Sequence, residues 1–178
     1  MEPALVQSYR WPAKLFHWLT ALAVVTAIVL GFAMVSAQPG PRQNQLYDLH
    51  RSFGALILAL TGARLLWRLF SPPPRLVPGM PKWQKTAATA MHRLLYVILI
   101  AMPLLGWAGT SAFPATITVF GLFELPPLVA PNRELSTILL GIHWRLAWLL
   151  CVLIAGHIAA ALYHHFVVRD ETLRRMLP

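Results

Sequence analysis

Residues 138–168 read ILLGIHWRLAWLLCVLIAGHIAAALYHHFVV, a run in which Arg145 is the only Lys, Arg, Asp or Glu. A helix needs about 20 apolar residues to cross the roughly 30 Å hydrocarbon core of a membrane, so this segment is long enough to span it. Three further runs, 15–35, 50–70 and 91–112, have suitable lengths and lack the alternation typical of membrane β-strands. The sequence therefore predicts an all-α integral membrane protein, a four-transmembrane-helix bundle forming a single membrane domain over residues 1–178.

The composition supports a membrane protein and excludes an ordinary soluble domain. Of the 178 residues, 57% are hydrophobic and 12% are charged, whereas soluble proteins have roughly 25% charged residues. The net charge of +9 indicates basic cytoplasmic loops rather than nucleic-acid binding. One cysteine, Cys151, excludes an intrachain disulfide and a structural Cys zinc site, and no CxxCH motif for covalent haem is present. The first apolar run has no convincing cleavage site, so we expect a retained span rather than a signal peptide.

Proline-rich segments separate the spans. QPGP at 38–41 follows the first run and SPPP at 71–74 follows the second. The third connection, 113–137, stays fairly apolar, so we expect it to lie on the membrane surface or to cap the bundle. No internal repeat is evident.

The distribution of basic residues predicts the orientation. Eleven of the fifteen Lys and Arg residues fall on the side of the N-terminus. The other four lie on the opposite side: Arg42, Arg51, Arg133 and Arg145. By the positive-inside rule, both termini are cytoplasmic in a multi-pass protein of the bacterial inner membrane.

All seven histidines fall within or at the edge of a predicted span: His17, His50, His92, His143, His157, His164 and His165. Ionisable side chains inside a membrane are costly and mark functional sites by default, although each alone could simply join two helices by a hydrogen bond. His143 and His157 are fourteen residues apart, nearly four turns and about 21 Å, so they share a helix face. Threading the spans brings His50 to the level of His143 near the outer side, and His17 to the level of His157 near the inner side.

Each level offers two imidazoles, which favours haem over zinc. Zinc requires three or four protein ligands, and Asp48 is the only acidic residue near either pair. Two imidazoles are what the iron of a six-coordinate haem needs. Nearby glycines (Gly54, Gly141 and Gly156) would let a macrocycle approach the helices. We therefore predict two non-covalent b haems that form an electron-transfer path.

Several motifs carry a family resemblance over essentially the whole chain: WPAKLFHW at 11–18, LHRSFG at 49–54, the fourth span with its histidines, and RDETLRRMLP at 169–178. The chain resembles the bacterial cytochrome b561 family, in particular its small four-helix superoxide oxidases (superoxide:ubiquinone oxidoreductases). The resemblance implies two b haems, with axial pairs His17–His157 at the inner side and His50–His143 at the outer side. It also implies a quinone site on the inner side, where His92 and His164 would bind ubiquinone or relay protons.

The expected activity is oxidation of superoxide at the periplasmic side and reduction of ubiquinone near the cytoplasmic side. Arg42 and Arg133 would steer superoxide, whereas Arg51 and Arg145 flank the outer ligands and would pair with haem propionates. Lys82 and Arg75 are weaker candidates for a lid over the quinone. His165 has no assigned role.

Two other functions remain open. The chain could be a b-type cytochrome subunit that passes electrons between a partner dehydrogenase or hydrogenase and the quinone pool. It could also be a haem-free transporter or scaffold, which would be colourless when purified. The tail after Val168 has ten residues and offers little docking surface, which favours a self-contained enzyme for which a protein partner is possible but not required.

Overall fold

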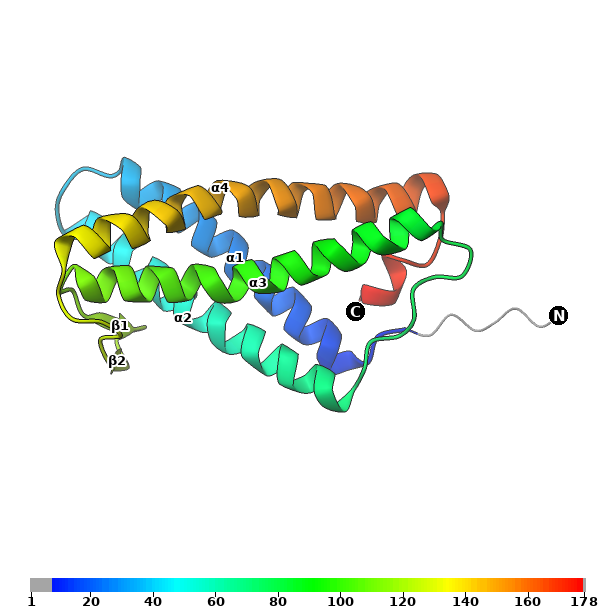
Figure 1. Cartoon of the computed structure of the whole chain (residues 1–178), viewed down its shortest axis with the longest axis horizontal. Helices are drawn as coiled ribbons and strands as arrows, with labels where there is room; N and C mark the ends of the chain where they lie inside the picture. The colour runs from blue at the N-terminus through cyan, green and yellow to red at the C-terminus, as the bar shows by residue number, and fades with distance from the viewer. Residues whose placement is uncertain (1–7, 178) are drawn as a thin grey trace.

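Four long helices make up most of the structure, a computed structural model that describes residues 8–177. In chain order they are α1 (Trp11–Ser36), α2 (Pro41–Phe70), α3 (Lys82–Ala112) and α4 (Arg133–Tyr163), shown in Figure 1. Each is long and apolar enough to cross a membrane. The predicted four-helix membrane bundle is confirmed.

The helices extend beyond the predicted spans. α2 begins at Pro41 instead of residue 50, and α3 begins at Lys82 instead of residue 91. The prediction counted only apolar residues, whereas the first turns of both helices are polar and project past the apolar part of the bundle. Proline at the first position favours the start of α2 because its missing N–H would be unpaired there anyway. In α4 the side chain of Asn132 accepts a hydrogen bond from the Leu135 N–H at 2.9 Å and caps the helix.

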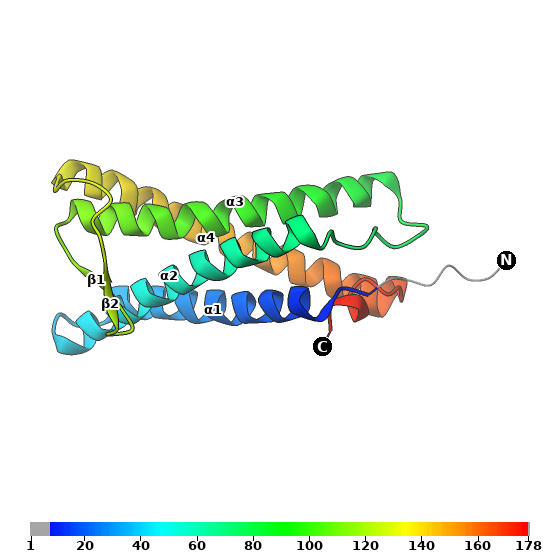
Figure 2. The same cartoon turned by 90° about the horizontal axis from the view of Figure 1, so that it is seen from below.

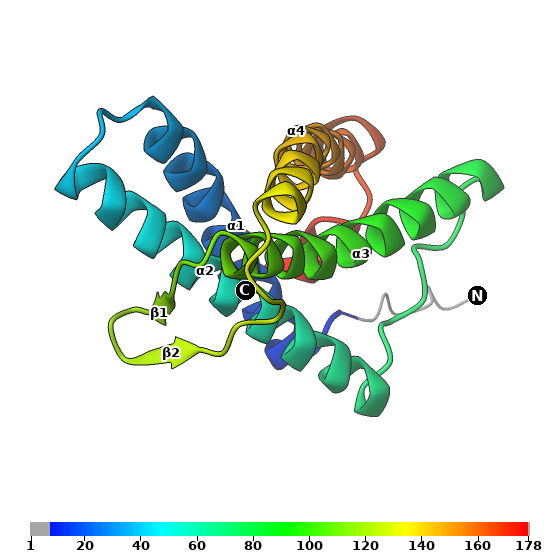
Figure 3. The ribbon, with the colours of Figure 1, turned by 60° about the vertical axis from the view of Figure 1, so that its left-hand side comes forward.

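The bundle consists of two helical hairpins. α1 packs along α2, and α3 packs along α4, with a further contact between α2 and α3 (Figures 2 and 3). Small and branched apolar side chains fill the space between the hairpins: Ala23, Val24, Ala27, Ile57, Ile98, Met102 and Leu150. Because alanines dominate α1 at this interface, its backbone can approach its neighbours closely.

The two hairpins carry a weak internal repeat that sequence analysis did not detect. LGFAMVS at 30–36 in α1 matches LGWAGTS at 105–111 in α3. Fourteen residues separate His17 from Gly31, and the same spacing separates His92 from Gly106. In the second helix of each hairpin, His50 is followed fourteen residues later by Arg64, and His143 by His157. Corresponding residues of the two hairpins therefore lie at corresponding depths.

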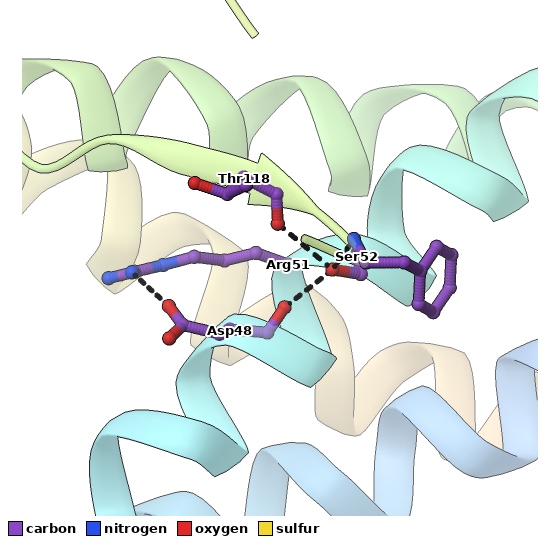
Figure 4. Close-up of polar contacts among 5 residues, drawn as sticks. Asp48, Arg51, Ser52 and Thr118 are labelled. Atoms are coloured by element: carbon purple, nitrogen blue, oxygen red, sulfur yellow. Dashed lines mark hydrogen bonds and ion pairs between the residues drawn. The ribbon is translucent and has the colours of Figure 1, made fainter. Parts of the chain in front are cut away.

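A small hairpin covers one end of the bundle. Strands β1 (Ile117–Val119) and β2 (Phe123–Leu125) pair antiparallel, with Thr118 opposite Glu124, and β1 packs against α2. The buried hydroxyl of Ser52 in α2 accepts a hydrogen bond from the Phe120 N–H at 2.9 Å and donates to the Asp48 carbonyl at 2.7 Å (Figure 4). The third connection thus caps the bundle, one of its two predicted positions.

At the opposite end the C-terminal segment folds back onto α1. A π-helical turn (His164–Val168) follows α4, and a 3₁₀ turn (Arg174–Met176) ends the described chain. Lys14 donates to the Leu177 carbonyl at 2.6 Å, and the Trp18 indole N–H donates to the Met176 carbonyl at 2.9 Å. These bonds hold the tail over the first turns of α1.

Candidate functional site

His50 and His143 form the outer pair, one from α2 and one from α4. Their ring centres are 6.0 Å apart and the ring planes cross at 78°. A metal–imidazole bond of about 2 Å, and about 1 Å from nitrogen to ring centre, would place two rings on opposite sides of one iron roughly 6 Å apart. The outer pair has the spacing of two axial ligands.

Hydrogen bonds to two backbone carbonyls fix which nitrogen of each ring is free. His50 Nδ1 lies 2.9 Å from the Ala27 carbonyl, and His143 Nδ1 lies 2.9 Å from the Met102 carbonyl. A carbonyl can only accept, so each Nδ1 carries the proton and each Nε2 keeps its lone pair. This second contact is typical of metal-binding histidines, since it fixes both the tautomer and the ring orientation.

Two glycines make room for these rings. A Cβ on Gly31 would lie 3.2 Å from His50 Cε1, and a Cβ on Gly106 would lie 3.2 Å from His143 Cε1. Gly31 comes four residues after Ala27, and Gly106 comes four residues after Met102. One helical turn therefore provides both the space for each imidazole and the carbonyl that orients it. Sequence analysis missed Gly31 and Gly106 because their role depends on which helix faces which histidine.

The outer pair lines one apolar cavity. Gly54, one turn after His50, lines this cavity, whereas Gly141, two residues before His143, is not among its lining residues. Gly156 lies beside His157 at the other level. The remaining lining residues are Val24, Ala27, Ile28, Gly31, Phe32, Met34, Ile57, Leu99, Met102, Pro103, Trp144, Ala147, Leu150 and Cys151. Apart from the two imidazoles the walls carry no ionisable group except the Cys151 thiol, so the cavity suits a large apolar cofactor.

His17 and His157 form the inner pair, from α1 and α4. Their ring centres are 6.2 Å apart with planes at 74°, again the spacing expected for two ligands of one iron. His92 of α3 lies beside them, 5.5 Å from His157. This second distance is shorter than two opposed metal bonds give, so the geometry favours His17 over His92 as the partner of His157.

His164 is buried and held by a carboxylate. Its Nδ1 donates to Asp170 Oδ2 at 2.6 Å across the π-helical turn. Burial raises the pKa of Asp170, but hydrogen bonds from Thr172 and His164 outweigh it and hold that pKa below its usual range. Among the described residues no hydrogen bond or ring contact joins His164 to His92. Sequence analysis did not identify Asp170. An acidic residue six positions after a histidine at the end of a span indicates a candidate hydrogen-bond partner for that imidazole.

The arginines predicted at the outer end differ in their surroundings. Arg51 contacts Asp48 at 3.4 Å (Figure 4). The Arg51 Cζ atom also lies over the Tyr47 ring, 5.4 Å from its centre. Arg145 next to Trp144 is exposed, as are Arg42 and Arg133 at the starts of α2 and α4. Arg51 therefore has a protein counter-ion, whereas the three exposed arginines leave a positive charge at this end.

The donor sets fit haem iron and not an ordinary metal site. Within residues 8–177, no group of three or more His, Cys, Asp or Glu side chains converges on one point. Each pair instead supplies two opposed imidazoles, and a macrocycle would supply the other four nitrogens. Two such sites, one at each level of the bundle, can hold a pair of one-electron carriers.

Comparison with known proteins agrees with this geometry. The family model for prokaryotic cytochrome b561 matches residues 8–178. The chain is 36% identical to cytochrome b561 homolog 2 of Escherichia coli (strain K12), over 91% of this chain and 87% of that protein. It is 35% identical to cytochrome b561 homolog 1 of the same strain, over 91% and 92% of the two chains. It is 34% identical to the probable superoxide oxidase CybB of Yersinia pestis, over 91% of each chain.

Proposed function

The chain belongs to the prokaryotic cytochrome b561 family of membrane electron-transfer proteins, and we propose that it oxidises superoxide at the outer side and reduces ubiquinone at the inner side. The observation that carries the proposal is the presence of two imidazole pairs, each about 6 Å across, at two depths of one bundle. Two b haems bound at these pairs would supply one-electron transfer between the two sides. In the balanced reaction, two superoxide ions and two protons reduce one quinone to quinol and release two molecules of oxygen.

His17, His50, His143 and His157 are the proposed haem ligands. The outer pair presents its Nε2 lone pairs because Ala27 and Met102 hold the other nitrogens. The inner pair matches the same spacing. The family implies b-type haem, and the four histidines account for two of them.

The outer end is proposed to attract superoxide by charge. Arg42 and Arg133 are exposed at the first turns of α2 and α4, two to three turns before the outer ligands on the same helices. A local positive field raises the encounter rate of a small anion by roughly 10–10³-fold. Arg51 and Arg145 flank the outer ligands in the sequence and are the proposed partners of the propionates of the outer haem.

The inner end is proposed to bind quinone and to supply its protons. His92 stands next to the inner pair, and His164 is fixed by Asp170 with its Nε2 directed away from that carboxylate. Imidazole exchanges protons near neutral pH more readily than any other side chain. The excess of Lys and Arg at this end supports a cytoplasmic location, from which the protons would be taken.

The proposal is tested by spectra of the purified protein in detergent. A pyridine haemochrome assay should give two b haems per chain, and a superoxide source should reduce them within the mixing time. Added ubiquinone should reoxidise them and yield quinol. His92→Ala and His164→Ala should keep both haems and lose the reoxidation by quinone, whereas unchanged turnover in both variants would move the quinone site elsewhere.

The same experiment addresses the alternative in which a partner dehydrogenase or hydrogenase supplies the electrons. That function predicts two reducible haems that respond to quinol but only slowly to superoxide. Prompt reduction by superoxide with this chain alone would exclude the need for a partner. The name of the Yersinia pestis relative supports the superoxide reaction.

A further inference from the structure

One face of α2 lies along the interior of the bundle. It is mostly apolar near the outer pair and basic near the inner end. At alternating steps of four and three residues it presents His50, Gly54, Ile57, Thr61, Arg64 and Arg68. The first three line the cavity of the outer pair, and Ile57 and Thr61 are buried. Because the face is continuous, Arg64 and Arg68 point into the bundle rather than into lipid.

Arg64 lies at the depth of the inner pair. It follows His50 by fourteen residues, as His157 follows His143, so in the internal repeat Arg64 occupies the position of His157. By the same fourteen-residue spacing, His17 precedes Gly31 and His92 precedes Gly106, so both histidines lie at this level as well. At this position of the repeat, α4 therefore supplies an imidazole and α2 supplies a guanidinium.

The two guanidiniums share a neutral partner. The Arg64 and Arg68 Cζ atoms each lie 5.3 Å from the centre of the Tyr96 ring in α3, and Arg68 Nη1 donates to the Tyr96 hydroxyl at 3.2 Å. Tyr96 therefore holds both side chains together without neutralising either charge.

Neither arginine has an anionic partner in the described part of the chain. The ion pairs there join Arg51 to Asp48, His164 to Asp170, and Arg174 to Glu171. A charged side chain at membrane depth is costly unless an opposite charge faces it. Thr61 precedes Arg64 by about one turn on the same face and is 1% exposed. Its hydroxyl also lacks a hydrogen-bond partner. Two cations and an unpaired hydroxyl on one helix face suit an anion with acceptor oxygens.

We propose that Arg64 and Arg68, held by Tyr96 and assisted by Thr61, bind the propionates of the haem at the inner pair. The inference rests on the proposed function, which places a haem at His17 and His157. A guanidinium binds a carboxylate through two parallel hydrogen bonds, and haem carries two carboxylates, so two arginines match two propionates. We call Arg64 and Arg68 the propionate clamp. The two imidazoles alone leave the macrocycle free to rotate about the line that joins them, and the clamp would fix that rotation.

The first test substitutes Gln for each arginine in the full-length protein and measures haem content and redox titration. The Arg64→Gln, Arg68→Gln double variant should retain the outer haem and lose part of the inner haem. Any inner haem that remains should have a lower midpoint potential, because removal of positive charge favours ferric iron. Lys85→Gln, at an exposed position in α3, is the charge-matched control and should leave both haems unchanged. Two full haems with unchanged potentials in the double variant would overturn the clamp.

The second test asks whether the carboxylates are what the arginines bind. Membranes from haem-deficient cells are loaded with haem or with haem dimethyl ester, in which both propionates are esterified. The wild-type inner site should prefer haem by at least tenfold, and the double variant should bind both equally. Equal binding by the wild type would overturn the proposal. A requirement of the arginines for anionic lipid instead of propionate would assign them to a lipid phosphate and would also overturn it.

Failure of the clamp is distinguishable from failure of the proposed function. If wild-type protein contained a single haem, held by the outer pair, then the proposed electron path would be wrong. If it contained two haems with identical preferences in the wild type and the double variant, only the role of Arg64 and Arg68 would be wrong.

Discussion

The proposed haem ligands can be tested one residue at a time. We predict that His157→Ala removes the inner haem and leaves the outer haem in place, and that His143→Ala does the reverse, because each substitution deletes one of only two axial ligands. The haemochrome absorbance per protein should fall by about half in either variant. His165→Ala, which changes a histidine outside both pairs, should retain the full absorbance. Loss of both haems from either ligand variant would contradict two independent sites.

The contact between His164 and Asp170 makes the C-terminal segment sensitive to acid. Because the folded-state pKa of Asp170 is lowered, the ionised carboxylate stabilises the folded segment. That stabilisation is fully present above the ordinary Asp pKa of about 3.9 and disappears as the pH falls through the lower folded-state value. We predict that acid lowers the protection of amide hydrogens in residues 169–177, measured as the exchange rate relative to that of an unfolded peptide at the same pH.

Asp170→Asn provides the control for this behaviour. Its segment should be less protected than wild type at neutral pH, and this protection should change little on acidification, since no carboxylate remains at position 170 to be protonated. Equal exchange of the two proteins at neutral pH would mean that other contacts, such as those of Lys14 and Trp18, hold the segment.

The sequence identifies the candidate histidines, but it does not identify the glycines and backbone carbonyls that contact their rings. An imidazole in a long apolar run is conspicuous, and the fourteen-residue spacing gives both its face and its depth. Gly31 and Gly106 are unremarkable among glycines of membrane helices, and the carbonyls of Ala27 and Met102 leave no mark in the sequence. Their role follows from the packing of one helix against another, which is a tertiary property.

At the scale of the helix, α1 and α3 provide the space and the backbone carbonyls that hold His50 of α2 and His143 of α4. We predict that Gly31→Leu or Gly106→Leu displaces the facing imidazole and removes the outer haem, while the inner haem stays. Gly31→Ala should have a smaller effect, because its Cβ needs a shift of only a few tenths of an ångström. Gly141→Leu is the matched control, since a Cβ there meets nothing within 4 Å. An outer haem that survives both leucine variants would show that the rings are held without the glycines.

The helix limits show which signals the sequence lacks. Hydropathy locates the part of each helix that crosses the membrane, and all four predicted spans fall in helices or, at the end of the fourth, in the π-helical turn. It does not locate the polar first turns of α2 and α3, nor the short β1–β2 hairpin, whose three-residue strands form only against α2. The packing of neighbouring elements decides those features.

At the scale of the molecule, positive charge at the outer end should govern the reaction with superoxide. We predict that reduction of the outer haem approaches the diffusion range and slows as salt is raised, because screening shortens the reach of the field. Arg42→Glu and Arg133→Glu should slow it further and leave the haem spectrum unchanged. Stopped-flow measurement at several ionic strengths checks this. Slow reduction that is independent of salt would favour a partner dehydrogenase as donor.

The two levels of histidines also have a consequence for energy conversion. They lie about 21 Å apart in a hydrocarbon core of roughly 30 Å, so an electron that passes between them crosses about two thirds of the membrane dielectric. With the inside negative, each transfer works against the membrane voltage, at roughly 1.6 kcal/mol per 100 mV. In the proposed reaction, protons taken up at the inner face would add to the same separation of charge, so turnover should be electrogenic. In proteoliposomes given a superoxide source, a voltage-sensitive dye should report a potential, and an ionophore that abolishes it should accelerate quinol formation.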